Sequence, residues 1–223
     1  MRQNRHAPRL AMFMLLLTLM GCSKGSEDEL LNTVERAEVA PMFAQGFEDA
    51  SRVEPSRTAY DPDPGIRRRM SDQFARNLRR NFSLEFAMPD PEQFIRSGAA
   101  SEVADRKLEA LGLPINDLAS ASVLMFGLAW ELANGEKLTP AHQQALVRQV
   151  AKQLSDRDSG PDLQREADAR LILAALWLEE SRLRRGSPDQ TRELSDAVQR
   201  DMKRMSGNDM RAHDIKDGGF AER

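Results

Sequence analysis

Prolines in this chain recur directly after residues that can cap or terminate a helix. Five such pairs follow residue 60, namely Asp63-Pro64, Asp90-Pro91, Thr139-Pro140, Gly160-Pro161 and Ser187-Pro188. Proline is tolerated at the first position of a helix, because its missing amide hydrogen would have no intrahelical partner there. The pairs therefore predict five helix starts, and Asn116-Asp117 predicts a sixth. The expected C-terminal stops are Gly112, Gly135 and Gly186.

The spacing of apolar residues within these segments favours an all-α fold. Two stripes have helical spacing and polar backs, Val147-Val150-Ala151-Leu154 and Leu194-Ala197-Val198-Met202-Met205. Residues 118–133 and 171–178 are apolar on nearly all sides, which is typical of the central helices of a bundle. Trp130 and Trp177, one on each, are expected to be core anchors, with a ligand pocket around them as the alternative. No segment sustains strand alternation, so we predict an all-α bundle of about six helices.

The first 21 residues have the layout of an export signal. Arg2, Arg5 and Arg9 precede an uncharged apolar run from Leu10 to Met20. This run of 11 residues is shorter than the roughly 20 needed to span a hydrocarbon core. A cleaved signal peptide over residues 1–21 is therefore favoured over a permanent transmembrane helix.

Cys22, the single cysteine, directly follows this leader. The motif Leu19-Met20-Gly21-Cys22 resembles the bacterial lipobox, which implies cleavage before Cys22, a diacylglyceryl group on its thiol and acylation of its amino group. Several acyl chains anchor a protein stably, because each buried methylene contributes about 0.8 kcal/mol. Ser23 favours the outer membrane over retention at the inner one, so we expect a lipoprotein of the bacterial cell envelope facing the periplasm. The alternative is an ordinary secretory leader beside a chance cysteine.

Charge and cysteine usage exclude several functions. The leader removes three of the 32 basic residues and none of the 35 acidic ones, so the mature chain has a net charge of −6. An acidic chain has no general attraction to phosphate backbones, so we expect no nucleic-acid partner. With its only cysteine used as the anchor, the chain has no thiol for a disulfide, a nucleophile or a metal site. No motif predicts a cofactor.

The mature chain divides into three parts by composition. Residues 22–59 carry few large apolar residues and are interrupted by Pro41, Gly46 and Pro55, which predicts a flexible lipid-anchored tether. Residues 60–205 contain the predicted helices and form the helical domain. Residues 206–223 are expected to form a polar C-terminal tail.

Three short motifs suggest a relationship to other proteins. They are Tyr60-Asp61-Pro62-Asp63-Pro64, Asn116-Asp117-Leu118-Ala119 and Gly219-Phe220. Together they resemble a family of exported bacterial proteins that is known as a domain of unknown function, over roughly residues 57 to 220. The resemblance implies an exported, all-helical domain and brings no catalytic residues with it.

The histidines of the mature chain give no support for catalysis. His142 lies in the first turn of a predicted helix, next to two glutamines, so we expect an exposed polar residue. His213 lies in the predicted tail. The sequence contains no HExxH, GxSxG or SxxK motif and no second histidine at metal-ligand spacing, so we expect no metal site.

Paired carboxylates are the one catalytic chemistry that the sequence leaves open. Murein-cleaving enzymes need an acid and a base or nucleophile roughly 5 to 9 Å apart. Glu131, on the most apolar helix, is the candidate general acid, and Glu179 or Glu180 could face it from the other central helix. The alternative places all three at helix ends, in solvent or in salt bridges with neighbouring arginines. Asp61 and Asp63 are expected to be turn and cap residues.

A basic amphipathic helix is predicted from Pro64 to Arg80. Its apolar stripe consists of Ile66, Met70, Phe74 and Leu78. Six arginines accompany the stripe and are assigned to a binding surface: Arg67, Arg68, Arg69, Arg76, Arg79 and Arg80. Such a face can meet an anionic lipid surface or an acidic envelope protein. The alternative is a bundle helix whose arginines pair with acidic neighbours, and both interpretations hold if part of the face is free.

These features favour a binding protein over an enzyme. We expect a lipid-anchored envelope protein that acts as a scaffold or chaperone-like accessory of an envelope or secretion complex. The alternative is a carboxylate-dependent murein or lipid hydrolase.

Overall fold

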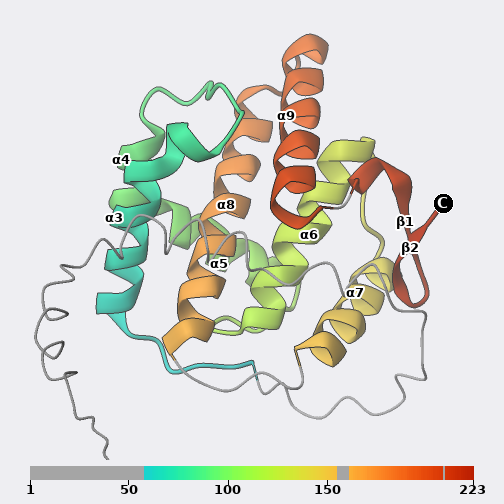
Figure 1. The fold of residues 1–223 in the computed structure, drawn as a ribbon, viewed down its shortest axis with the longest axis horizontal. Helices are drawn as coiled ribbons and strands as arrows, with labels where there is room; N and C mark the ends of the chain where they lie inside the picture. Colours follow the sequence, from blue (N-terminus) through green and yellow to red (C-terminus); the bar gives the residue numbers. More distant parts are fainter. Residues whose placement is uncertain (1–57, 155–160, 208) are drawn as a thin grey trace, which may run out of the picture.

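The chain forms a helical bundle followed by a small hairpin (Figure 1). The computed structural model describes residues 58–154, 161–207 and 209–223. The helices are α3 (Pro64–Asn81), α4 (Pro91–Arg96), α5 (Ala99–Ala110), α6 (Leu118–Asn134), α7 (Pro140–Gln153), α8 (Pro161–Leu183) and α9 (Pro188–Ser206). A 3₁₀ turn, η1 (Met210–Ala212), leads into strands β1 (His213–Lys216) and β2 (Gly219–Glu222). The predicted all-α fold is confirmed.

Local sequence signals start most of these helices where they are predicted to start. The proline of each of the five pairs is the first residue of a helix, and Asn116-Asp117 directly precedes α6. The Asp63 side chain accepts hydrogen bonds from the amides of Gly65 at 2.7 Å and Ile66 at 3.4 Å, which confirms it as a cap. Helix α5 has no such signal: it follows Gly98, whose φ is 87°, and no side chain caps it. It is therefore missing from the sequence prediction.

Helices α6 and α8 form the centre of the bundle (Figure 1). Helix α8 packs against α3, α5 and α6, while α6 also packs against α7 and α9. Trp130 on α6 and Trp177 on α8 are each 1% exposed, which confirms them as core anchors. The predicted stripes of α3 and α9 are buried as well, as the helical period requires: Ile66, Met70, Phe74, Leu78, Leu194, Ala197, Val198, Met202 and Met205.

The C-terminal segment belongs to the core, so the prediction of a polar tail over residues 206–223 is wrong. Strands β1 and β2 pair in antiparallel register, with Ile215 opposite Phe220. These two side chains and Met210 are buried with the helices. Four-residue strands are too short to show sustained alternation in the sequence, which explains why the hairpin is not predicted.

A glutamine of α7 holds the hairpin in place. The Gln149 side chain accepts a hydrogen bond from the Phe220 amide at 2.9 Å and donates one to the Phe220 carbonyl at 3.3 Å. Gly219 has a φ of +107°, and a Cβ there would lie 2.2 Å from the Gln149 Oε1. Glycine is therefore required at this position, both by its backbone conformation and by the close approach of Gln149.

The chain enters the bundle beside the start of α6. The Thr58 hydroxyl donates to the Asp117 carboxylate at 2.6 Å, and the Tyr60 amide donates to the Asn116 carbonyl at 3.0 Å. Thr58 and Ala59, which the prediction assigns to the tether, thus belong to the folded domain. The leader, Cys22 and the rest of the tether lie outside the described residues. Within the described ranges, no helix has both the length and the apolarity to cross a membrane.

Candidate functional site

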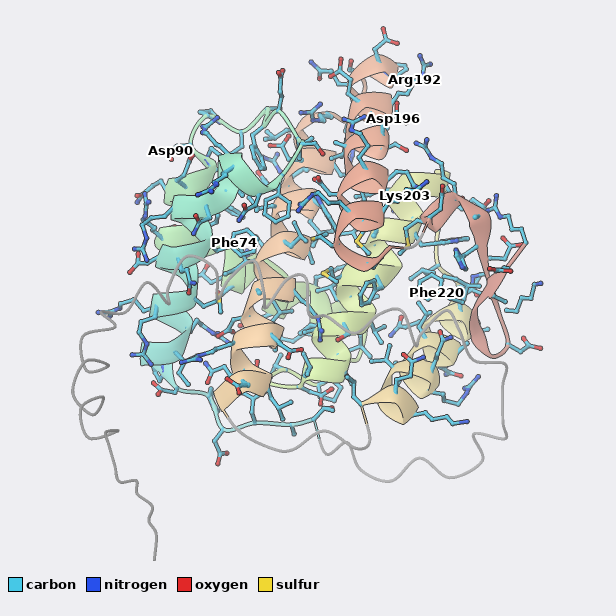
Figure 2. All side chains as sticks on the ribbon, in the orientation of Figure 1. Phe74, Asp90, Arg192, Asp196, Lys203 and Phe220 are labelled. Atoms are coloured by element: carbon cyan, nitrogen blue, oxygen red, sulfur yellow. The ribbon has the colours of Figure 1, made fainter. Side chains whose placement is uncertain are left out.

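The outer side of α3 presents five exposed arginines, which we call the arginine face: Arg68, Arg69, Arg76, Arg79 and Arg80. They point outward because the opposite side of the helix, with Phe74 and Leu78, is buried in the core. Figure 2 shows side chains projecting from this edge of the bundle. Five of the six predicted surface arginines therefore share one accessible side of one helix.

Four of the five arginines of this face form no ion pair with a described residue. Arg79 donates to Glu92 at 2.7 Å, and this hydrogen bond lowers the pKa of the Glu92 carboxyl. The other four arginines have no carboxylate partner among the residues that the structure describes. Asp72 lies on the same stretch of helix and forms no ion pair with a described residue. The face is thus a concentrated positive charge on an acidic protein.

Arg67 does not belong to this face, so its predicted role in surface binding is wrong. Its side chain is 27% exposed, and its Nε lies 3.2 Å from a carboxylate oxygen of Asp168 on α8. A second guanidinium nitrogen lies 3.5 Å from Asp105 on α5. Burial raises the pKa of both carboxyls. Arg67 faces the neighbouring helices because successive residues of a helix point about 100° apart.

The cluster around Arg67 joins the first turn of α3 to α8. Asp168 also accepts a hydrogen bond from Gln164 at 3.2 Å. Gln164 in turn donates to the Asp63 carbonyl and accepts from the Asp63 amide, both at 2.9 Å. Burial raises the pKa of the adjacent Tyr60 hydroxyl. The sequence signal for this cluster is the pair of polar residues four apart on an otherwise apolar side of α8, and its role is structural.

Glu131, the candidate general acid, closes the turn after α6. One carboxylate oxygen accepts the amide of Leu138 at 2.8 Å, and the other accepts the Lys137 ammonium at 2.8 Å. Its side chain is 15% exposed. Both oxygens are therefore occupied by the residues that directly follow the helix, which corresponds to the predicted alternative of a carboxylate in a helix-end salt bridge.

The two glutamates of α8, Glu179 and Glu180, have different partners from those of Glu131. Glu180 is completely buried and accepts the amides of Ala87 and Met88, each at 2.9 Å. It also accepts the Arg184 guanidinium at 3.0 Å. Glu179 pairs with Arg182, whose hydrogen bond lowers the pKa of the Glu179 carboxyl and keeps it ionised at neutral pH.

The three candidate carboxylates are held by separate contacts. Glu131 shares no hydrogen-bond partner with Glu179 or Glu180. Each of the three carboxylates already binds a cation or backbone amides of its own surroundings.

Both histidines are more buried than predicted. The His142 ring lies against Trp130 in a T-shaped contact, with ring centroids 6.3 Å apart. His213 is buried, and its Nδ1 lies 2.7 Å from the Asp209 carbonyl. The prediction of an exposed His142 is wrong because the hairpin and α6 cover one side of α7. Across the described ranges, no group of three or more His, Cys, Asp or Glu side chains is arranged to hold a metal ion.

An open groove of about 520 Å³ lies where the end of α6 meets the turn between α8 and α9. It is lined by Leu132, Ala133, Asn134, Gly135, Gly186, Ser187, Pro188, Thr191, Arg192 and Ser195. Figure 2 shows Arg192 near the N-terminal end of α9. No carboxylate is among the lining residues, so the groove has the character of a contact surface and lacks an acid or a base.

Comparison with known proteins adds no assignment. The chain matches no protein-family model, no curated protein and no solved structure.

Proposed function

We propose that this protein is a lipid-anchored envelope protein that acts by binding, as a scaffold or chaperone-like accessory of an envelope or secretion complex. Cys22 would hold it at the outer membrane, on the periplasmic side, through acyl chains on its thiol and amino group. The proposal rests on the lipobox-like leader for location and on the exposed surface of the helical domain for the mode of action.

The arginine face of α3 is the observation that carries the binding mode. Four neighbouring arginines without a carboxylate partner among the described residues repel one another and do not stabilise the fold by ion pairing. A partner that carries negative charge would match these arginines on the exposed side of α3. The candidate carboxylates, in contrast, are all explained by contacts inside the domain.

The anchor is tested by Cys22→Ala. The variant should lack labelled fatty acid, should stay unprocessed or be mis-sorted, and should no longer partition into detergent, because the thiol is the site of the first acylation. Metabolic labelling and phase partition measure this directly. Unchanged acyl labelling would show that the lipid is elsewhere and would end the lipoprotein proposal.

The mode of action is tested by comparing two variants in cells that lack the wild-type gene. Glu131→Gln should preserve function, because an amide at this position can still accept the Leu138 amide and no proton transfer depends on it. Replacement of Arg68, Arg69, Arg76 and Arg80 by Gln should abolish function at normal abundance. The opposite outcome, with Glu131→Gln inactive at normal abundance and the arginine variant active, would favour the hydrolase.

A further inference from the structure

The arginine face has no apolar centre. Ile115 and Leu183 are the exposed large hydrophobic residues in the described part of the chain, and neither lies on α3. The apolar side of α3 is buried in the bundle. Tight protein interfaces depend on a few large side chains in a desolvated centre. A face that offers charge alone suits a flat layer of anionic groups better than a protein pocket.

The position of α3 in the chain also favours a membrane. The described residues begin with Thr58, and α3, which starts at Pro64, is the first helix among them. Residues 22–57 separate the proposed anchor from this point. The flexible tether predicted for these residues would have an end-to-end distance of about 30 to 36 Å. The anchor would therefore keep α3 within reach of the bilayer surface.

We infer that the arginine face binds the phosphate headgroups of anionic phospholipids in the membrane that holds the anchor. This inference rests on the proposed lipid anchor and names the partner of the same face. An arginine close to an anionic membrane surface increases the affinity roughly fivefold (about 1 kcal/mol). The four arginines that form no ion pair with a described residue together thus account for a few hundredfold. Arg67 contributes nothing, because Asp105 and Asp168 hold it inside the bundle.

This contact would set the orientation of the domain. Salt screens the attraction between exposed charges beyond about 10 Å at about 0.1 M salt. Helix α3 must therefore lie against the membrane surface for its arginines to bind the headgroups. Helix α7 and the hairpin lie on the opposite side of the bundle from α3 (Figure 1). They would then face the periplasm, while α3 lies on the membrane.

Vesicle co-sedimentation tests the inference with the chain from residue 23 onward, which lacks the acylated cysteine and keeps every described residue. Vesicles of equal parts phosphatidylglycerol and phosphatidylcholine should bind it, and vesicles of phosphatidylcholine alone should not. Binding should weaken as salt rises from about 0.05 to about 0.3 M, because the attraction is screened. Replacement of Arg68, Arg69, Arg76 and Arg80 by Gln should weaken binding at least about 100-fold.

A matched variant removes the same charge elsewhere: Arg106, Arg185, Arg192 and Arg200, all exposed and outside α3, are replaced by Gln. It should bind like the wild type. Equal binding by the two variants would overturn the assignment to α3. No binding by the wild type at low salt, together with loss of cellular function in the α3 variant, would overturn the membrane inference and leave the proposed function intact with an acidic protein as partner.

Discussion

Glu180→Ala should lower the free energy of unfolding by about 3 to 5 kcal/mol, because it removes the buried carboxylate that pairs with Arg184 and leaves the exposed Glu193, at 3.4 Å, as the carboxylate partner. The Arg184 side chain is 5% exposed and also donates to the Glu85 carbonyl, so it cannot turn to solvent without releasing the loop before α4. The amides of Ala87 and Met88 would lose their acceptor as well. Urea unfolding followed by circular dichroism measures the difference.

The adjacent residue supplies the control for this prediction. Glu179→Ala removes the same charge one position earlier, from a pair whose Arg182 is 61% exposed. Exposed pairs contribute about 0 to 1 kcal/mol, so this variant should unfold close to the wild type. If Glu179→Ala and Glu180→Ala prove equally mild, the buried pair does not hold the loop, and Glu180 becomes available for another role.

Phe74→Ala should lower the free energy of unfolding by about 3 to 5 kcal/mol, because it opens a cavity in the interface between α3 and the rest of the core. The ring is completely buried and stacks on Phe82, with centroids 5.4 Å apart. Thermal and urea unfolding both measure this loss. The expected signature is a lower midpoint with an unchanged dependence on denaturant concentration.

Arg76→Gln is the matched change on the opposite side of the same helix. It should alter stability by no more than about 0.5 kcal/mol, as is usual for exposed positions. A large loss for Arg76→Gln with a harmless Phe74→Ala would reverse the two sides of α3. The surface-binding proposals would then fail together with this assignment.

The partners of the candidate site residues could not be predicted from the sequence. The sequence places Glu131 and Glu180 on apolar helices and leaves both catalysis and ion pairing open. The structure gives Glu180 a buried ion pair and backbone contacts, and the amides that it accepts come from residues more than 90 positions earlier in the chain. A contact between such distant residues leaves no spacing pattern near Glu180. The same reason applies to Arg67, whose partner Asp168 lies 101 positions later.

The hairpin is a second example. Its pairing residues are close in sequence, but two short strands are marginal on their own in water. They form here because Gln149 and Trp130 bind their backbone, Trp130 by donating to the His213 carbonyl at 2.9 Å. The composition of residues 206–223 is polar, so the sequence does not indicate that three apolar side chains of η1, β1 and β2 are buried.

The sequence by itself determined where most helices begin and which sides of them are buried, because a cap, a proline and a 3.6-residue period act within a few turns of the chain. The sequence also predicted six surface arginines on α3, and five of them are exposed, since they lie opposite the apolar stripe. Only the tertiary structure decided that Arg67 pairs with Asp105 and Asp168, that Glu180 holds a loop and that the last residues join the core. These outcomes depend on which distant segments meet, and packing of the complete bundle selects those contacts.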